Sequence, residues 1–405
     1  MKRKKIISFL LACFFTVAMP LNTLLTVTAA SVDMSPSAVI PDGIYYIKNK
    51  QLGVYLQVND DDAPNYSTVS EFMELHSYDG GDYQKWRITH TSNGYYKIAN
   101  VKSGYVLCVT SANAEIDGAP IIQQSYASIS RKRWRIECVN GDQWKLYLKS
   151  SEGTNLCMAA GDAATGFEWI TSGRNVLQRA YTDDSNYKDT WVLEPVSTDM
   201  NVVLYGIPDE VNNHDHSSAL ENIATDLSTL SDVSTYVMTD YSTSQNCAGT
   251  LHMANVFVSH SHGGYTNYSS GGLSRTYIYL DEDNTEILNS HYNSAAAGSC
   301  YLSGDYSNLD LALFIGCYTG QGGDGARNLP SRIVELGTTA AIGFTDEIIC
   351  SEANTWVEIF FDCLQSGWSI NEAITECRDH VTDTDLHTPT ACGQLGLILH
   401  DLYNP

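Results

Sequence analysis

Hydrophobic and polar residues follow two different patterns along the 405-residue chain. Between residues 41 and 196, short segments rich in Tyr, Val and Ile alternate apolar and polar positions, and Gly, Asn and Asp separate them. This alternation, broken by turn residues, predicts short half-buried β-strands. From residue 200 to residue 402, continuous apolar runs alternate with segments that have apolar residues at helical spacing. The second pattern predicts a mostly parallel sheet with helices on both faces.

The first region contains one pattern three times. Each copy has an aromatic-rich strand, a glycine, a second apolar strand and a closing tryptophan. The glycines are Gly53, Gly104 and Gly153, and the tryptophans are Trp86, Trp134 and Trp191. A unit of this size cannot bury its apolar face alone, so three copies predict an internally threefold, all-β domain.

These repeats resemble the ricin B-type lectin family, whose fold is a β-trefoil. The Q-x-W signature of that family is complete only in the first repeat, at Gln84 to Trp86. The resemblance implies that the three tryptophans belong to the core of the fold. Family members commonly bind sugar through an Asp that follows each repeat's glycine, and the residues at those positions here are Gln57, Cys108 and Cys157. Glycan binding and a purely structural role therefore both stay open.

Two apolar runs of the second region end in residues that carry chemistry. The run 254–260 is followed by His262-Gly263, and the run 311–315 is followed by Gly316-Cys317. Catalytic groups of open α/β sheets gather beyond the carboxyl ends of strands. We therefore expect Cys317 and His262 to form a nucleophile and imidazole pair. His260 is the rival imidazole, and an inert buried thiol is the alternative for Cys317.

The order of these elements resembles the caspase-like cysteine peptidases of clan CD. In chain order, the second region has a strand followed by His-Gly, a strand followed by Gly-Cys, a helix, an apolar strand and two further helices. Segments 334–343 and 367–373 are similar to the bacterial group named for the association of caspase and tetratricopeptide domains. The resemblance implies a cysteine-type endopeptidase with Cys317 as nucleophile and His262 as catalytic imidazole. The backbone N–H groups of Gly263 and Cys317 are the expected oxyanion hole. The alternative is a non-catalytic carbohydrate- or protein-binding protein on a degenerate caspase-like scaffold.

Substrate preference is open. Clostripain-like relatives carry an acidic residue two positions before the nucleophile, and Ile315 stands there in this chain. Asp324, Asp346 and Glu347 follow the expected strand ends and are candidates for a substrate pocket that accepts a basic side chain. Solvated loop acids are the alternative for each of them.

The amino-terminal residues 1–30 have the features of a secretory signal. Lys2 to Lys5 are followed by an apolar run and by Thr28-Ala29-Ala30, which predicts cleavage after Ala30 and secretion. A polar lead-in, 31–40, follows. Removal of four of the 23 basic residues leaves 19 against 47 acidic residues, a net charge of −28. This charge argues against nucleic acid and an anionic membrane as partners and leaves a protein or peptide substrate.

Neither a cofactor nor a metal is expected from the sequence. No CxxC pair or His/Cys spacing suggests zinc. The segment His214-Asp215-His216 is interpreted as a helix-entry loop in which the acid caps the helix and the histidines are solvated. Ten cysteines follow the signal segment, and an oxidising compartment would permit disulfides among them.

Overall fold

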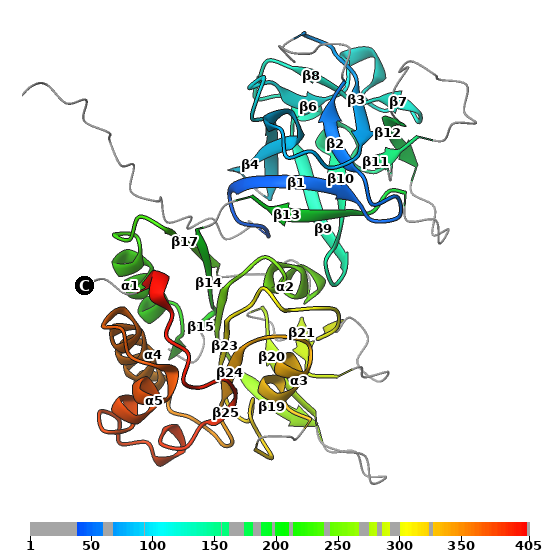
Figure 1. Ribbon diagram of the computed structural model, residues 1–405. Coiled ribbons are helices and arrows are strands. Elements are labelled where there is room, and N and C mark those ends of the chain that lie inside the picture. The colour runs from blue at the N-terminus through cyan, green and yellow to red at the C-terminus, as the bar shows by residue number, and fades with distance from the viewer. Residues whose placement is uncertain are drawn as a thin grey trace, which may run out of the picture.

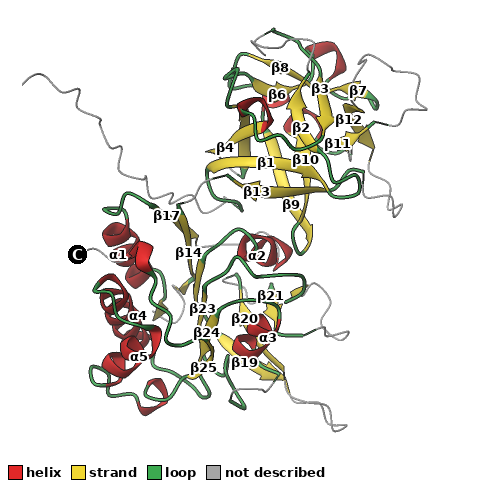
Figure 2. Ribbon diagram, viewed as in Figure 1, coloured by secondary structure: helices red, strands yellow, loops and turns green. Residues whose placement is uncertain are grey.

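Two regions of different architecture make up the protein (Figure 1). The computed structural model describes residues 39–59, 68–92, 94–154, 156–161, 174–180, 188–196, 199–209, 214–238, 244–266, 275–281, 286–291, 300–323 and 327–402. The predicted signal segment 1–30 and most of the lead-in lie outside these residues. The first region is all-β, and the second combines sheets with helices (Figure 2).

A closed barrel forms the centre of the first region. Six strands pair as antiparallel neighbours in the ring β1–β4–β5–β9–β10–β13–β1. They are β1 (Gly43–Asn49), β4 (Lys85–Ser92), β5 (Tyr95–Asn100), β9 (Trp134–Asn140), β10 (Gln143–Leu148) and β13 (Trp191–Pro195).

Three antiparallel pairs, one from each repeat, cover the barrel. They are β2 (Tyr55–Val58) with β3 (Met73–His76), β6 (Val106–Cys108) with β8 (Ile122–Gln124), and β11 (Leu156–Ala160) with β12 (Arg174–Ala180), and β7 (Ala119–Pro120) joins β12. Short 3₁₀ helices lie between strands at Asp82–Gln84, Ser111–Asn113, Ser130–Lys132 and Lys149–Ser151. This arrangement is the predicted β-trefoil.

The three repeat tryptophans make the same contact in each repeat. Their side chains are buried, and their Nε1–H groups donate to the carbonyl oxygens of Leu56, Leu107 and Met158 at 2.9, 3.0 and 2.9 Å for Trp86, Trp134 and Trp191. All three side chains lie in the hydrophobic core of the domain. The same contact fixes the register of the repeats. The residue after each acceptor is Gln57, Cys108 and Ala159, so the sequence-based assignment of Cys157 to the third position is wrong by two residues.

A six-stranded sheet organises the second region. Its order is β17-β14-β18-β23-β24-β25, in which the first five strands are parallel and β25 is antiparallel. The strands are β14 (Met200–Gly206), β17 (Val233–Met238), β18 (Val256–His260), β23 (Leu311–Ile315), β24 (Ala340–Gly343) and β25 (Thr390–Gly393). Thr390–Gly393 takes the edge position, and the more apolar run at 395–399 forms no strand.

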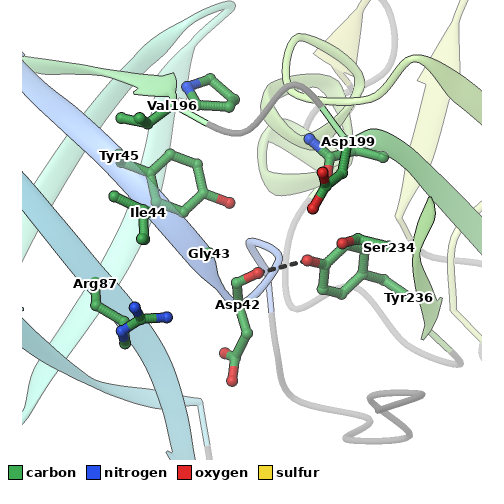
Figure 3. Close-up of a pocket in the computed structure, with 11 residues that line it drawn as sticks. Asp42, Gly43, Ile44, Tyr45, Arg87, Val196, Asp199, Ser234 and Tyr236 are labelled. Atoms are coloured by element: carbon green, nitrogen blue, oxygen red, sulfur yellow. Dashed lines mark hydrogen bonds between the residues drawn. The ribbon is translucent and has the colours of Figure 1, made fainter. Parts of the chain in front are cut away.

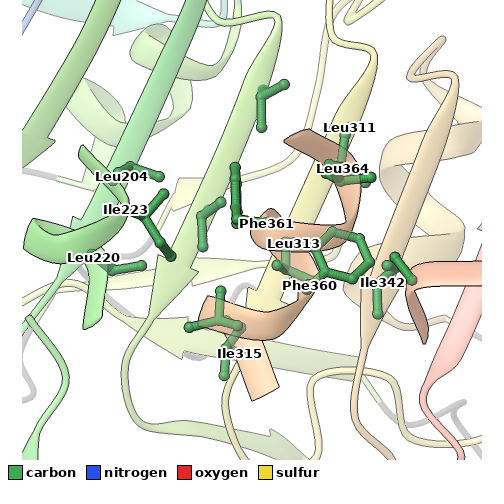
Figure 4. Packing of buried hydrophobic residues seen from close by; sticks show 14 of the residues in the cluster. Leu204, Leu220, Ile223, Leu311, Leu313, Ile315, Ile342, Phe360, Phe361 and Leu364 are labelled. Atoms are coloured by element: carbon green, nitrogen blue, oxygen red, sulfur yellow. The ribbon is translucent and has the colours of Figure 1, made fainter. Parts of the chain in front are cut away.

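Helices cover both faces of this sheet (Figure 1). One face is covered by α1 (Ser218–Leu227), α4 (Cys350–Gln365) and α5 (Ile370–Arg378). The other face is covered by α2 (Ser244–Leu251) and α3 (Leu329–Glu335). In Figure 4, Leu204, Leu313 and Ile342 of the strands meet Ile223 of α1 and Phe360 of α4. The apolar runs and the helical spacing therefore fold as predicted. Turns of 3₁₀ helix follow at Thr384–Leu386 and His400–Leu402.

A second, smaller sheet lies beside the main one. It contains β19 (Gly263–Thr266), β20 (Arg275–Tyr279), β21 (Ile287–Asn289) and β22 (Cys300–Tyr301). The aromatic-rich strand β20 thus belongs to this sheet and not to the edge of the main one. A short hairpin of β15 (Pro208–Asp209) and β16 (His214–Asp215) precedes α1.

The two regions contact each other through β9 and α2. The Cys138 N–H donates to Asn246 Oδ1 at 2.8 Å, and Thr250 Oγ1 donates to the carbonyl of Val39 at 2.7 Å. A cleft of about 310 Å³ opens nearby between Arg87 of β4 and Asp199, and the Tyr236 hydroxyl donates to the Asp42 carbonyl at its wall (Figure 3). Its lining includes the second residues of β14 and β17, so the cleft lies at the amino ends of the parallel strands.

Two further observations concern the described residues as a whole. None of their helices has the length and apolar character that crossing a membrane requires. No disulfide joins the ten cysteines between residues 39 and 402.

Candidate active site

Neighbouring strands deliver Cys317 and His262 to one edge of the main sheet. β18 and β23 pair in parallel with His260 opposite Ile315, and the Ser261 N–H donates to the Ile315 carbonyl at 3.0 Å. Each candidate residue lies two positions beyond its strand, and each is partly exposed. The structure therefore brings the two predicted catalytic residues to the same carboxyl edge, opposite the end that holds the cleft of Figure 3.

The backbones that carry these residues touch. A Cβ on Gly263 would lie 2.5 Å from the Cys317 carbonyl oxygen, and a Cβ on Gly316 would lie 2.6 Å from the Ser261 carbonyl oxygen. Real Cβ atoms do not approach other atoms so closely, so only glycine fits at either position. The Gly263 backbone, predicted as an oxyanion donor, thus lies directly against the segment that carries Cys317.

The loop after Cys317 is held in one conformation. Tyr318 has φ +61°, a left-handed value that is uncommon for a bulky residue and that surrounding contacts must impose. Thr319 is buried, and its Oγ1 donates to the Phe314 carbonyl at 2.8 Å and accepts from the Phe344 N–H at 3.0 Å. Neither residue could be predicted from the sequence as part of the site, because its contribution is to the conformation of the loop.

The environment of Cys317 favours the neutral thiol. Burial raises the pKa of Cys317 above its usual value, the charge of Glu347 raises it further, and the Ile348 N–H opposes both effects. That N–H donates to Sγ at 3.5 Å. The thiol therefore needs a base or a bound substrate before it acts as a nucleophile.

Two of the three predicted pocket acids lie beside Cys317. Asp346 and Glu347 are exposed, the Tyr318 N–H donates to the Asp346 carbonyl at 3.1 Å, and the Tyr318 hydroxyl donates to Glu347 Oε1 at 3.1 Å. Desolvation and this hydrogen bond raise the pKa of Tyr318 to about 12. The Tyr318 ring also meets Tyr265 of β19 edge-on, with ring centroids 5.0 Å apart. Asp324 lies outside the described residues.

A group of histidines extends behind His262. The His216 ring contacts His260 and His262, with centroids 4.6 and 5.1 Å apart. His260 is only 1% exposed, and burial lowers its pKa well below the usual value, so a substrate does not reach it and its ring is neutral. This accessibility favours His262 over His260 as the catalytic imidazole.

The segment that precedes α1 differs in part from the sequence-based interpretation. Asp215 does cap the helix, because its Oδ1 accepts from the N–H groups of Ser217 and Ser218 at 3.0 and 3.1 Å. The expectation that His216 is solvated is wrong, since this side chain is 5% exposed. Its Nδ1 lies 3.4 Å from Sγ of Cys350, the first residue of α4. His216, His260 and Cys350 form a group that could hold a metal ion, which the spacing of residues in the sequence did not predict.

The usual sugar positions of the β-trefoil are neutral and buried. Gln57, Cys108 and Ala159 are all inaccessible, and the Gln84 amide donates to Gln57 Oε1 at 3.0 Å. An aromatic group lies nearby on the first repeat. The rings of Tyr46, Tyr55 and Tyr78 contact one another with centroids 5.1 to 5.9 Å apart, and Tyr78 is 57% exposed.

Comparison with known proteins places the first region in a family. Residues 37–124 and 82–178 match the ricin-type β-trefoil lectin domain-like family. The amino-terminal region of this chain is therefore a ricin B-type β-trefoil domain. No curated protein matches the chain.

Solved structures that are similar cover about two fifths of the chain. The designed threefold-symmetric protein ThreeFoil is 28% identical over 38% of this chain and all of its own, with a TM-score of 0.33. An exo-β-1,3-galactanase from Clostridium thermocellum is 24% identical over 39% of this chain and 31% of its own, with a TM-score of 0.31. The Macrolepiota procera ricin B-like lectin, solved with lactose, is 17% identical over 38% of this chain and 96% of its own, with a TM-score of 0.30.

Proposed function

We propose that the protein is a secreted cysteine endopeptidase of the caspase-like type, with Cys317 as nucleophile and His262 as catalytic imidazole. The observation that carries this proposal is the contact between the two strand-end segments. Gly263 and Gly316 bring the His262 and Cys317 backbones into contact at the carboxyl edge of a mostly parallel sheet. The left-handed Tyr318 beside the thiol supports it, because backbone strain gathers at active sites.

The proposed reaction is a two-step acyl transfer. The Cys317 sulfur attacks the scissile carbonyl carbon as its proton passes to His262, and the backbone N–H groups of Gly263 and Cys317 stabilise the oxyanion. The C–N bond then breaks, and His262 protonates the departing amine, which leaves a thioester on Cys317. Water attacks the thioester carbonyl, releases the carboxylate product and restores the thiol.

A preference for basic side chains in the substrate fits the charges around the site. Asp346 and Glu347 are exposed on the loop that contacts Tyr318, and the chain as a whole has a net charge of −24. A lysine or arginine side chain next to the scissile bond would lie near these carboxylates. A positional peptide library incubated with the purified chain measures this preference directly. Equal cleavage after acidic and basic residues would contradict it.

The test of the nucleophile is Cys317→Ala in the full chain. We expect the variant to lose peptide hydrolysis and labelling by an electrophilic thiol probe at this position. Cys300→Ala is the matched control, since Cys300 is another partly exposed thiol of the same region and lies in β22. Hydrolysis that survives Cys317→Ala unaltered would refute the assignment and favour a non-catalytic binding protein.

We further propose that the β-trefoil domain is an accessory module that binds glycans through Tyr46, Tyr55 and Tyr78. The match to the lectin-domain family and the exposure of Tyr78 support this role. A tyrosine offers an apolar ring and a polar hydroxyl to a wet interface. A glycan array compares wild type, Tyr78→Ala and the control Tyr126→Ala, which removes another exposed tyrosine of the same domain. Loss of binding only in Tyr78→Ala is the expected result, and no binding by any of the three would leave the domain a structural role.

A further inference from the structure

Three side chains of metal-ligand type meet behind the proposed active site. His216 follows β16, His260 ends β18 and Cys350 begins α4. One ligand atom from each residue lies within 4.8 Å of the other two. Asn354 of α4 holds the segment before α1 in place, because its amide donates to the Asp215 carbonyl at 2.9 Å.

His260 is the residue that points to a ligand. Its side chain is 1% exposed, and neither of its ring nitrogens has a hydrogen-bond partner in the part of the chain that the structure describes. A buried polar atom without a partner costs free energy, and native proteins rarely leave one in this state. A metal ion that accepts a nitrogen lone pair would remove this cost at one of the two nitrogens.

We propose that His216, His260 and Cys350 bind a divalent transition metal ion of the zinc type. Thiolate and imidazole ligands together suit zinc better than magnesium or calcium, which prefer oxygen. Bond lengths of about 2.0–2.1 Å to nitrogen and about 2.3 Å to sulfur, at a tetrahedral angle, separate the two ligand atoms by about 3.5 Å. The observed separation of His216 Nδ1 and Cys350 Sγ is 3.4 Å, so this pair needs almost no movement.

The site is distinct from the proposed catalytic pair but adjacent to it. Asp215 caps α1 and does not belong to the ligand set, and the His262 ring lies against His216 with centroids 5.1 Å apart. Three protein ligands leave the fourth position of a tetrahedron for water or another donor. An ion here would also join three segments that are distant in the sequence, so we expect it to raise the unfolding temperature of the full chain.

The test is a titration of the reduced full chain with Zn²⁺ in competition with a chromophoric chelator. We expect one equivalent to bind to wild type and to Cys317→Ala, and affinity to fall at least about 100-fold in Cys350→Ser, since even outer-shell changes cost 10–100-fold. Cys300→Ser is the matched control and keeps wild-type affinity. With Co²⁺, a sulfur-to-metal charge-transfer band should be present in Cys317→Ala and absent in Cys350→Ser.

Two results would overturn the proposal. Absence of binding by wild type is the first. The second is loss of binding in Cys317→Ala with retention in Cys350→Ser, which would place the ion on the proposed catalytic pair. Far-ultraviolet circular dichroism establishes that each variant is folded, and His216→Asn replaces Cys350→Ser if the latter does not fold. Because Cys317→Ala is expected to bind metal without hydrolysing peptides, failure of this inference and failure of the proposed peptidase are separate outcomes.

Discussion

In the β-trefoil domain, each of the three repeats makes the same tryptophan hydrogen bond. At the carboxyl edge of the six-stranded sheet, by contrast, the segments that carry His262 and Cys317 meet at one place, which we call the single-copy site. Trp86, Trp134 and Trp191 make one hydrogen bond in three copies, with donor–acceptor distances that agree within 0.1 Å. The contact of Gly263 with the Cys317 carbonyl joins two unlike segments, one that carries His262 and one that carries Cys317. Repetition serves the shared core, because each repeat needs its neighbours to bury its apolar face. A catalytic site needs different side chains, such as a thiol and an imidazole, close together, so its local structure does not repeat in the way that the core contacts do.

The substitution with the largest expected effect is Gly263→Ala at the single-copy site. The new Cβ would lie 2.5 Å from the Cys317 carbonyl oxygen and 2.9 Å from Thr319 Cγ2, so the two strand-end segments must separate. A displacement of about 1 Å at a catalytic site costs about 10²-fold in rate. We expect a loss of at least this size in kcat/KM for peptide hydrolysis.

Gly396→Ala is the control for this change. Gly396 is exposed, and no atom lies within 4 Å of a Cβ built there, so the same chemical change is accommodated without movement. Circular dichroism shows whether Gly263→Ala keeps the wild-type secondary structure. Wild-type kcat/KM in a folded Gly263→Ala protein would contradict the proposed role of the contact.

The next effect belongs to the repeated core. Trp191→Phe removes the Nε1–H donor to the Met158 carbonyl and part of the buried ring, and we expect a loss of about 2–3 kcal/mol in the free energy of unfolding of the β-trefoil. Trp86→Phe and Trp134→Phe should cost the same within about 1 kcal/mol, because their environments repeat, whereas kcat/KM stays unchanged in all three. Urea unfolding and peptide hydrolysis measure these quantities. Very unequal losses among the three variants would show that the three repeats contribute unequally to the free energy of unfolding.

The same comparison explains how much could be predicted from the sequence. The strand at Leu311–Ile315 was predictable to the residue, because a continuous apolar run ends at Gly316. Helix α2 was not, since its residues Ser244–Leu251 are buried on nearly all sides and show little helical spacing of apolar residues. The edge strand Thr390–Gly393 was missed for a related reason. Its residues are small or polar, whereas the nearby run 395–399 is apolar but packs as a loop against the core.

Some residues of the candidate site could be predicted from the sequence, and others could not. Cys317 and His262 could be predicted, because short motifs at strand ends mark them. The group of His216, His260 and Cys350 could not, since His216 and Cys350 are 134 residues apart and no local spacing links them. Tyr318 and Thr319 were also missed, because their contribution is the conformation of a loop, which only the folded chain displays.

The smallest predicted effect tests the electrostatics of the single-copy site through Glu347→Gln. Burial is the first cause of the raised pKa of Cys317, and the negative charge of Glu347 adds to it by disfavouring the thiolate. Removing that charge lowers the pKa. The thiolate fraction, and with it the rate of alkylation by a thiol probe, therefore rises at every pH below the pKa and converges with wild type above it. The amide oxygen of Gln can still accept a hydrogen bond from the Tyr318 hydroxyl, which keeps the loop contact in place.

Glu152→Gln is the control, because it makes the same change in net charge on the exposed surface of the β-trefoil and should leave the pH profile of alkylation unchanged. Because charges that face solvent are screened, the difference between the two variants should shrink as salt is raised from 0.01 M, where the Debye length is about 30 Å, to 1 M, where it is about 3 Å. Equal profiles for Glu347→Gln and wild type at low salt would show that burial and the Ile348 N–H alone set the state of the thiol.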